Sequence, residues 1–95
     1  MKKYEVMYIL RSTLEGEAIK ADVEKLSNVL TSKGAKVLET KEWGFRELAY
    51  EIDHNKRGYY VWLLVEAPVE ALNEFNRVVR INEDVIRHIV VNYEG

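Results

Sequence analysis

Side chains that could serve acid–base or nucleophilic chemistry are few and widely separated. His54 lies in a polar stretch and His88 in an apolar segment near the C-terminus, and neither has a serine close to it in the sequence. The two histidines also lack the four-residue spacing of helical zinc sites. Cysteine is absent, which excludes disulfides, thiolate zinc ligands and cysteine nucleophiles. We therefore predict that the chain is not an enzyme and binds no metal, cofactor or small-molecule substrate.

Acidic and basic residues nearly balance, and the formal net charge is -2. The whole molecule does not attract a polyanion, so a nucleic-acid partner would have to meet a local basic patch. Two basic pairs, Lys2-Lys3 and Lys56-Arg57, have no obvious structural task. We expect these pairs, more than the arginines of the predicted second helix, to contact phosphate.

Bases and aromatic side chains are most densely combined in residues 56–63, Lys-Arg-Gly-Tyr-Tyr-Val-Trp-Leu. Such a combination can bind phosphate and stack on nucleobases. Strand alternation sends Tyr60 and Trp62 to one face of a sheet and Tyr59 and Val61 to the other. We expect Tyr60 and Trp62 on an open face, although aromatics here could simply pack across strands. The segment partly resembles the RNA-recognition-motif signature, but its aromatic alternation is incomplete.

Hydrophobic periodicity predicts the elements of the first half of the chain. The apolar run from Tyr4 to Leu10 is typical of a strand that is buried on both sides and therefore central. Apolar residues then recur at helical spacing up to Gly34, a common helix terminator, after Ser12 and Thr13, which we expect to cap the helix.

The second half repeats this order after a hairpin. Segments 36–52 and 59–66 are rich in strand formers, and we expect the polar residues 53–58 between them to form a long, mobile tip. Pro68 opens a second amphipathic helix, and a last strand spans 85–93. The face of that helix is formed by Ala71, Leu72, Phe75, Val78 and Val79.

The order βαββαβ predicts an α+β, ferredoxin-like sandwich. Its four-stranded antiparallel sheet would carry both helices on one face and leave the other open. The length of 95 residues fits one domain, 1–95. No apolar segment is long enough for a signal peptide or membrane span, so we expect the chain to begin near residue 1 and to work in the cytoplasm.

The stretch 44–52, Gly-Phe-Arg-Glu-Leu-Ala-Tyr-Glu-Ile, resembles the signature of the family of the sixth protein of the bacterial small ribosomal subunit. The resemblance extends over essentially the whole chain. It includes the opening Lys3-Tyr4-Glu5, the Gly58-Tyr59-Tyr60 that precedes Trp62, and the closing His88-Ile89-Val90-Val91. One departure is Asp53, an acid directly after the signature.

The resemblance implies a structural constituent of the small ribosomal subunit with a ferredoxin-like fold. It further implies cooperative binding to the central domain of the ribosomal RNA, as a heterodimer with ribosomal protein eighteen. Expected RNA contacts are Lys2, Lys3, Arg46, Lys56, Arg57 and Arg87. Expected stacking or protein-partner contacts are Tyr4, Tyr50, Tyr60 and Trp62.

A protein-only module of the same fold is the main alternative. Its open sheet face would pair with itself through apolar contacts. Such pairing should tolerate high salt, whereas RNA binding should weaken steeply with salt.

Overall fold

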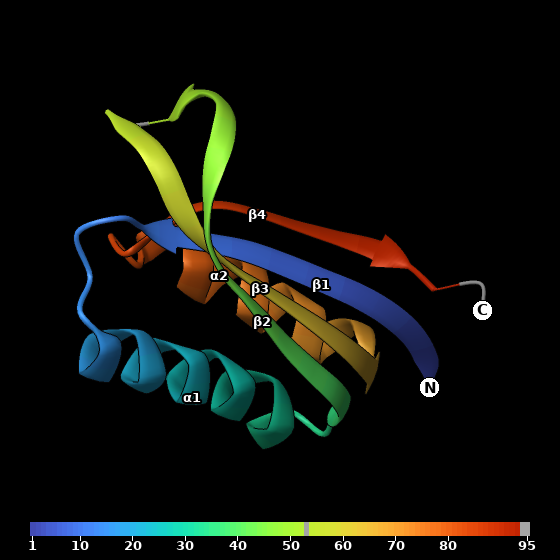
Figure 1. Ribbon diagram of the computed structural model, residues 1–95. Coiled ribbons are helices and arrows are strands. Elements are labelled where there is room, and N and C mark those ends of the chain that lie inside the picture. Colours follow the sequence, from blue (N-terminus) through green and yellow to red (C-terminus); the bar gives the residue numbers. More distant parts are fainter. Residues whose placement is uncertain (53, 94–95) are drawn as a thin grey trace.

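Six elements follow one another in the order βαββαβ, as the sequence predicts. The computed structural model describes residues 1–52 and 54–93, and Asp53 lies outside these ranges. The elements are β1 (Lys2–Arg11), α1 (Gly16–Ser32), β2 (Lys36–Ile52), β3 (Asn55–Ala67), α2 (Val69–Ile81) and β4 (Val85–Asn92). Both helices cover the same face of the sheet (Figure 1).

The sheet is antiparallel throughout, in the order β2-β3-β1-β4. The predicted central position of β1 is therefore confirmed, with β3 on one side and β4 on the other. Strands β1 and β3 pair without interruption from Lys2 opposite Ala67 to Arg11 opposite Gly58. Strands β2 and β4 form the two edges.

The core lies between the helices and one face of the two inner strands. Val6, Tyr8 and Leu10 of β1 are fully buried, as are Val61 and Leu63 of β3. The residues predicted for the inner face of α2 are all buried against them. Removing this apolar surface from water is the main favourable contribution to folding. The alternate residues of the same strands face away from the helices.

The first helix begins later than the sequence predicts. Its N-cap is Glu15, which makes no side-chain capping hydrogen bond. The predicted caps are wrong because both hydroxyls are engaged elsewhere: Ser12 bonds to Asn55, and Thr13 accepts a hydrogen bond from Arg11. The predicted stop is confirmed, since α1 is followed by Gly34 at φ +90°, in the left-handed region that favours glycine.

The predicted long tip at 53–58 is wrong, because strand pairing continues to Ile52 and Asn55. His54, at φ +66°, supports a short turn instead. The polar residues from Asn55 onward form the first part of β3, where polar side chains are tolerated because this part of the hairpin is solvent-exposed. The hairpin end rises from the sheet on the side away from the helices (Figure 1).

Gly58 allows Ile9 to pack directly over the β3 backbone. A Cβ atom at residue 58 would lie 2.2 Å from Ile9 Cγ2 and 3.2 Å from the Leu10 carbonyl oxygen. Ile9 is itself almost completely buried, so its side chain has little room to move. We expect Gly58→Ala to lower the free energy of unfolding by about 1–3 kcal/mol, measured by urea denaturation.

Gly16 provides the matched control. It opens α1, and a Cβ atom there would meet nothing within 4 Å. Gly16→Ala should therefore leave stability unchanged or raise it by about 0.4–1 kcal/mol. Equal stability of the two variants would contradict the steric argument.

Candidate functional site

The sheet face opposite the helices carries a continuous, partly exposed apolar surface. Trp43 is 42% exposed, Ile89 41% and Val91 45%. Two shallow hollows of about 170 and 180 Å³ lie side by side on this face and share Met7 and Ile89. Their other apolar lining residues are Ile9, Tyr60, Trp43, Trp62 and Val91. An exposed apolar patch of this kind indicates a surface that binds another macromolecule.

Two cations from β2 lie against the aromatic rings of this face. Lys41 Nζ is 5.4 Å from the centroid of the Trp62 ring, and Arg46 Cζ is 5.7 Å from that of Trp43. Cation–π contacts at exposed sites contribute about 0.5–1 kcal/mol each. They hold the two positive charges beside the apolar surface, where a partner would meet both.

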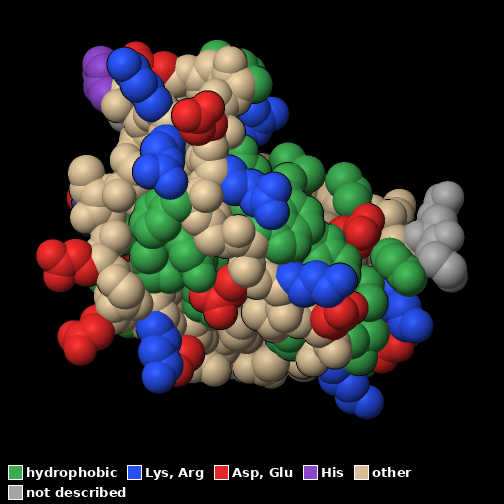
Figure 2. All heavy atoms as spheres, in the orientation of Figure 1, with side chains coloured by type: hydrophobic (Ala, Val, Ile, Leu, Met, Phe, Trp, Pro, Cys, Tyr) green, Lys and Arg blue, Asp and Glu red, His purple; other side chains and the backbone are tan. Residues whose placement is uncertain are grey.

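Further cations lie on the hairpin formed by the far ends of β2 and β3. Lys56 and Arg57 are exposed, and the Arg57 guanidinium is 5.9 Å from the Phe45 ring. Glu47 and Glu51 line the same shallow hollow as these two bases. Figure 2 shows basic and acidic side chains mixed on the hairpin. The hairpin therefore offers cations at fixed positions but no strong positive field.

Two aromatic rings in contact, one of them hydrogen-bonded to a glutamate, support the base of this hairpin. Phe45 packs edge-on against Tyr59 at a ring-centroid distance of 5.2 Å, and the Tyr59 hydroxyl donates to Glu42 Oε1 at 2.9 Å. Partial burial, followed by the bond to Glu42, raises the pKa of Tyr59. Tyr59 therefore remains a neutral donor that ties β3 to the edge strand β2.

The structure separates the two basic groups predicted from the sequence. Lys2 lies opposite Ala67, whereas Gly58, next to Arg57, lies opposite Arg11 at the other end of β1. Nine residue steps of strand span roughly 30 Å. Lys2 and Lys3 therefore cannot form one patch with Lys56 and Arg57.

The four aromatic residues predicted to stack or to contact a partner lie on three different parts of the molecule. Tyr60 and Trp62 lie on the open face, as expected. Tyr4 does not, because it lies opposite Val65 and packs against the core on the helix side. Tyr50 stands on the hairpin and is 61% exposed. Sequence reasoning did not find Trp43 or Lys41, although the alternation of bases and aromatics along β2 was a usable signal.

Tyr50 and Arg87, predicted separately, meet in the structure. Arg87 Nη1 donates to the Tyr50 hydroxyl oxygen at 2.6 Å, which joins β4 to the hairpin end of β2. Nothing in the sequence pattern could have indicated this contact, because the residues lie 37 positions apart in strands that are not neighbours.

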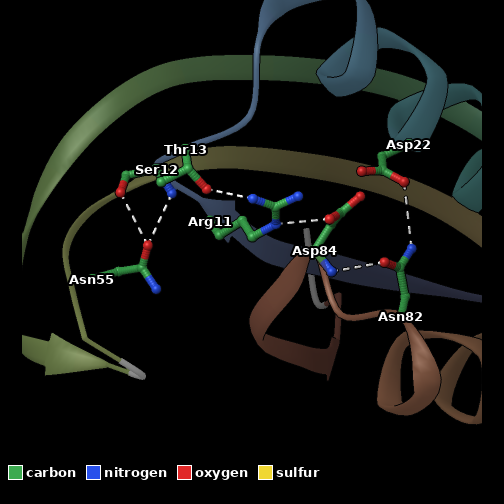
Figure 3. Close-up of polar contacts among 7 residues, drawn as sticks. All are labelled: Arg11, Ser12, Thr13, Asp22, Asn55, Asn82 and Asp84. Atoms are coloured by element: carbon green, nitrogen blue, oxygen red, sulfur yellow. Dashed lines mark hydrogen bonds and ion pairs between the residues drawn. The ribbon is translucent and has the colours of Figure 1, made fainter.

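The other strand of the hairpin is bonded to the turn after β1 (Figure 3). Asn55 Oδ1 accepts hydrogen bonds from both the backbone N–H and the hydroxyl of Ser12, each at 3.0 Å. Asn55 Nδ2 donates to the Ile52 carbonyl oxygen at 3.2 Å. One side chain thus closes the hairpin end and attaches it to the β1–α1 connection.

The same connection is attached to the other half of the fold. Arg11 Nε donates to Asp84 Oδ1 at 2.8 Å, and the Asp84 N–H donates to Asn82 Oδ1 at 2.9 Å. Asn82 Nδ2 then donates to Asp22 Oδ1 at 3.4 Å (Figure 3). Asp22, on α1, is only 8% exposed. This network links β1, α1 and the turn between α2 and β4.

Two carboxyl groups in this network have pKa values shifted in opposite directions. Burial, then the hydrogen bond with Asp84, raises the pKa of Asp22 to about 6. The same hydrogen bond, together with Arg11, lowers the pKa of Asp84. The neighbouring arginine thus favours the ionised form of Asp84, while burial favours the protonated form of Asp22.

The two histidines are not brought together. His54 is exposed beside the hairpin turn, whereas His88 lies opposite the buried Tyr8. Partial burial, then the charge of Arg80, lowers the pKa of His88. Within residues 1–52 and 54–93, no three histidine or acidic side chains group in a way that could hold a metal ion. None of the helices described is long and apolar enough to cross a membrane.

The four-stranded sheet with one covered and one open face defines a ferredoxin-like domain. Residues 3–92 match the family of Ribosomal protein S6. The chain therefore belongs to the ribosomal protein S6 family, a family of structural proteins of the small ribosomal subunit.

The fold is that of a solved structure, 30S ribosomal protein S6 from Thermotoga maritima. That protein is 22% identical in sequence, with a TM-score of 0.93, and the match covers 97% of this chain and 87% of that chain. The resemblance predicted from residues 44–52 is thus confirmed at the level of family and fold.

The carboxyl pair predicts an unusual pH dependence. Because the pKa of Asp22 is raised on folding, the stability that its protonated form contributes is present below about pH 4 and is lost as the pH rises through about 6. Asp22→Asn keeps the acceptor for Asn82 and supplies a donor toward Asp84 without a charge. The free energy of unfolding of the variant, minus that of the native protein, should rise by about 2 kcal/mol from about pH 4 to about pH 8. Urea denaturation at the two pH values measures this difference.

Glu24→Gln is the matched control, since it removes an exposed carboxylate from the same helix. Its effect on the free energy of unfolding should not differ between the two pH values. An Asp22→Asn effect that is equally independent of pH would contradict the raised pKa of Asp22.

Proposed function

We propose that this protein binds the central domain of small-subunit ribosomal RNA together with ribosomal protein eighteen, with which it forms a heterodimer in the cytoplasm. Membership of the ribosomal protein S6 family supports the ribosomal setting. The observation that carries the rest is the exposed apolar sheet face beside a hairpin that bears cations. A phosphate backbone cannot cover apolar surface, whereas a second protein can.

The two surfaces therefore have different partners. Tyr60 and Trp62, with Trp43 beside them, contact the partner protein, because their faces are apolar and adjoin the two hollows. Tyr4 is left out of this contact, since it packs on the core.

The cations outside the apolar centre contact phosphate. Lys56 and Arg57 on the hairpin, with Arg46 close by, form one group, and Lys2 and Lys3 form a second at the far end of β1. Cations in these positions fix the register of RNA without reading its sequence. Arg87 is bonded to Tyr50, which lies on the same hairpin as the first group.

Weak binding by the chain alone follows from its charge. The net charge is -2, and two acids share the surface of Lys56 and Arg57. A small number of phosphate contacts gives modest affinity and a shallow salt dependence. A basic partner docked on the sheet face would add the missing cations to one composite surface.

The direct test is binding of the purified protein to a central-domain RNA fragment, with and without ribosomal protein eighteen, at about 50 and about 200 mM salt. We expect salt-sensitive binding that requires both proteins, measured as a dissociation constant for the pair. If RNA binding is absent both with and without ribosomal protein eighteen, and this chain forms a salt-resistant dimer instead, the proposal is contradicted and the protein-only module is favoured.

Two arginine-to-glutamine variants test whether the hairpin contacts phosphate. Arg57→Gln should weaken RNA binding of the heterodimer about 3- to 10-fold and reduce the slope of log affinity against log salt by about 1, because one phosphate contact is lost. Arg77→Gln removes the same charge from α2, where Arg77 is paired with Glu74. The control should bind as the native protein does, and equal losses in both variants would mean that only total charge matters.

A further inference from the structure

Each strand of the hairpin is attached to the rest of the fold by one polar contact, β2 through Tyr50 and β3 through Asn55. We propose that the Tyr50–Arg87 and Ser12–Asn55 hydrogen bonds position this hairpin, so that its cations meet phosphate in a fixed orientation. Arg87 and Asn55 are then positioning residues, and Arg87 acts through Tyr50 in addition to any phosphate that its other donors reach. The inference rests on the proposed function, in which Lys56 and Arg57 contact RNA.

The first contact crosses the sheet. Tyr50 belongs to β2 and Arg87 to β4, which are the two opposite edges of a sheet ordered β2-β3-β1-β4. Two strands separate them, so the bond is possible only because the hairpin end of β2 leaves the plane of the sheet and passes over its open side (Figure 1). The bond fixes how far over the sheet the hairpin leans.

The second contact fixes the other strand. Asn55, the first residue of β3, accepts two hydrogen bonds from Ser12, whose neighbour Arg11 is ion-paired with Asp84. The anchor is therefore a turn that is itself tied to the body of the fold. Lys56 and Arg57 follow Asn55 directly, so their direction depends on this anchor.

The hairpin needs such contacts because its own pairing is weak near the end. The β2–β3 register is irregular between Glu47 and Ile52. An isolated two-stranded ribbon is marginally stable in water, and a mobile ribbon would have to be ordered at the moment of binding. Contacts that order it beforehand raise affinity without adding any contact to RNA.

Variants that remove one hydroxyl and no charge separate positioning from electrostatics. Tyr50→Phe and Ser12→Ala should each weaken RNA binding of the heterodimer about 3- to 10-fold, the effect of one lost hydrogen bond. The salt slope should stay at its native value, because the number of neutralised phosphates does not change. This differs from Arg57→Gln, which lowers the slope.

Two controls show whether the lost contact is the cause. Ser12→Thr keeps the hydroxyl, so the heterodimer that carries it should bind RNA with native affinity. Tyr93→Phe removes the hydroxyl of an exposed tyrosine after β4 that belongs to neither contact. It should bind as the native protein does.

Amide hydrogen exchange of the free protein supplies a readout that needs no RNA. Exchange of residues 47–52 and 54–58 should accelerate in Tyr50→Phe and Ser12→Ala, while the buried amides of β1 stay at native rates. If both variants bind RNA with native affinity, the inference is overturned and the proposed function stands. If the native heterodimer does not bind the RNA fragment, the proposed function fails and the inference fails with it.

Discussion

Strands β1 and β3 pair along their whole length, and their alternate side chains lie in two very different surroundings. On one side Val6, Val61 and their neighbours are sealed by the two helices. Since the period of a strand is two, the same pairing fixes which residues remain on the other side, Met7 and Trp62 among them. A one-residue slip would exchange the two sets, so the core and the partner surface are specified by a single register.

The hairpin extends this arrangement beyond the core and therefore depends on polar contacts. The hairpin end is attached to β4 through Tyr50 and to the turn after β1 through Asn55. That turn is fixed in part by Asp84. Its carboxylate is paired with Arg11, and its backbone N–H bonds to Asn82, which in turn bonds to the buried Asp22. Because burial raises the pKa of Asp22, this carboxyl group lowers stability at neutral pH relative to acidic pH, while its bond to Asn82 connects the support of the hairpin to α1.

Local periodicity was sufficient for the element order, the inner face of α2 and the placement of Tyr60 and Trp62 on the open face. The hairpin length was not predictable in the same way, because the polar run 55–58 has the composition of a loop although it forms the start of β3. Capping by Ser12 failed for a related reason: its hydroxyl has a partner 43 residues away. Contacts between distant residues leave no periodic signal in a single sequence.

In the proposed RNA-binding role, the placement of this chain's cations matters more than its net charge of -2. Two arginines of the proposed phosphate-binding group are already held by aromatic rings, Arg46 by Trp43 and Arg57 by Phe45. An engaged guanidinium loses little further freedom when it meets a phosphate, because its direction is already set. A near-neutral protein can therefore contribute accurately placed cations while a basic partner contributes the field. In the proposed function, the apolar sheet face brings these two contributions together.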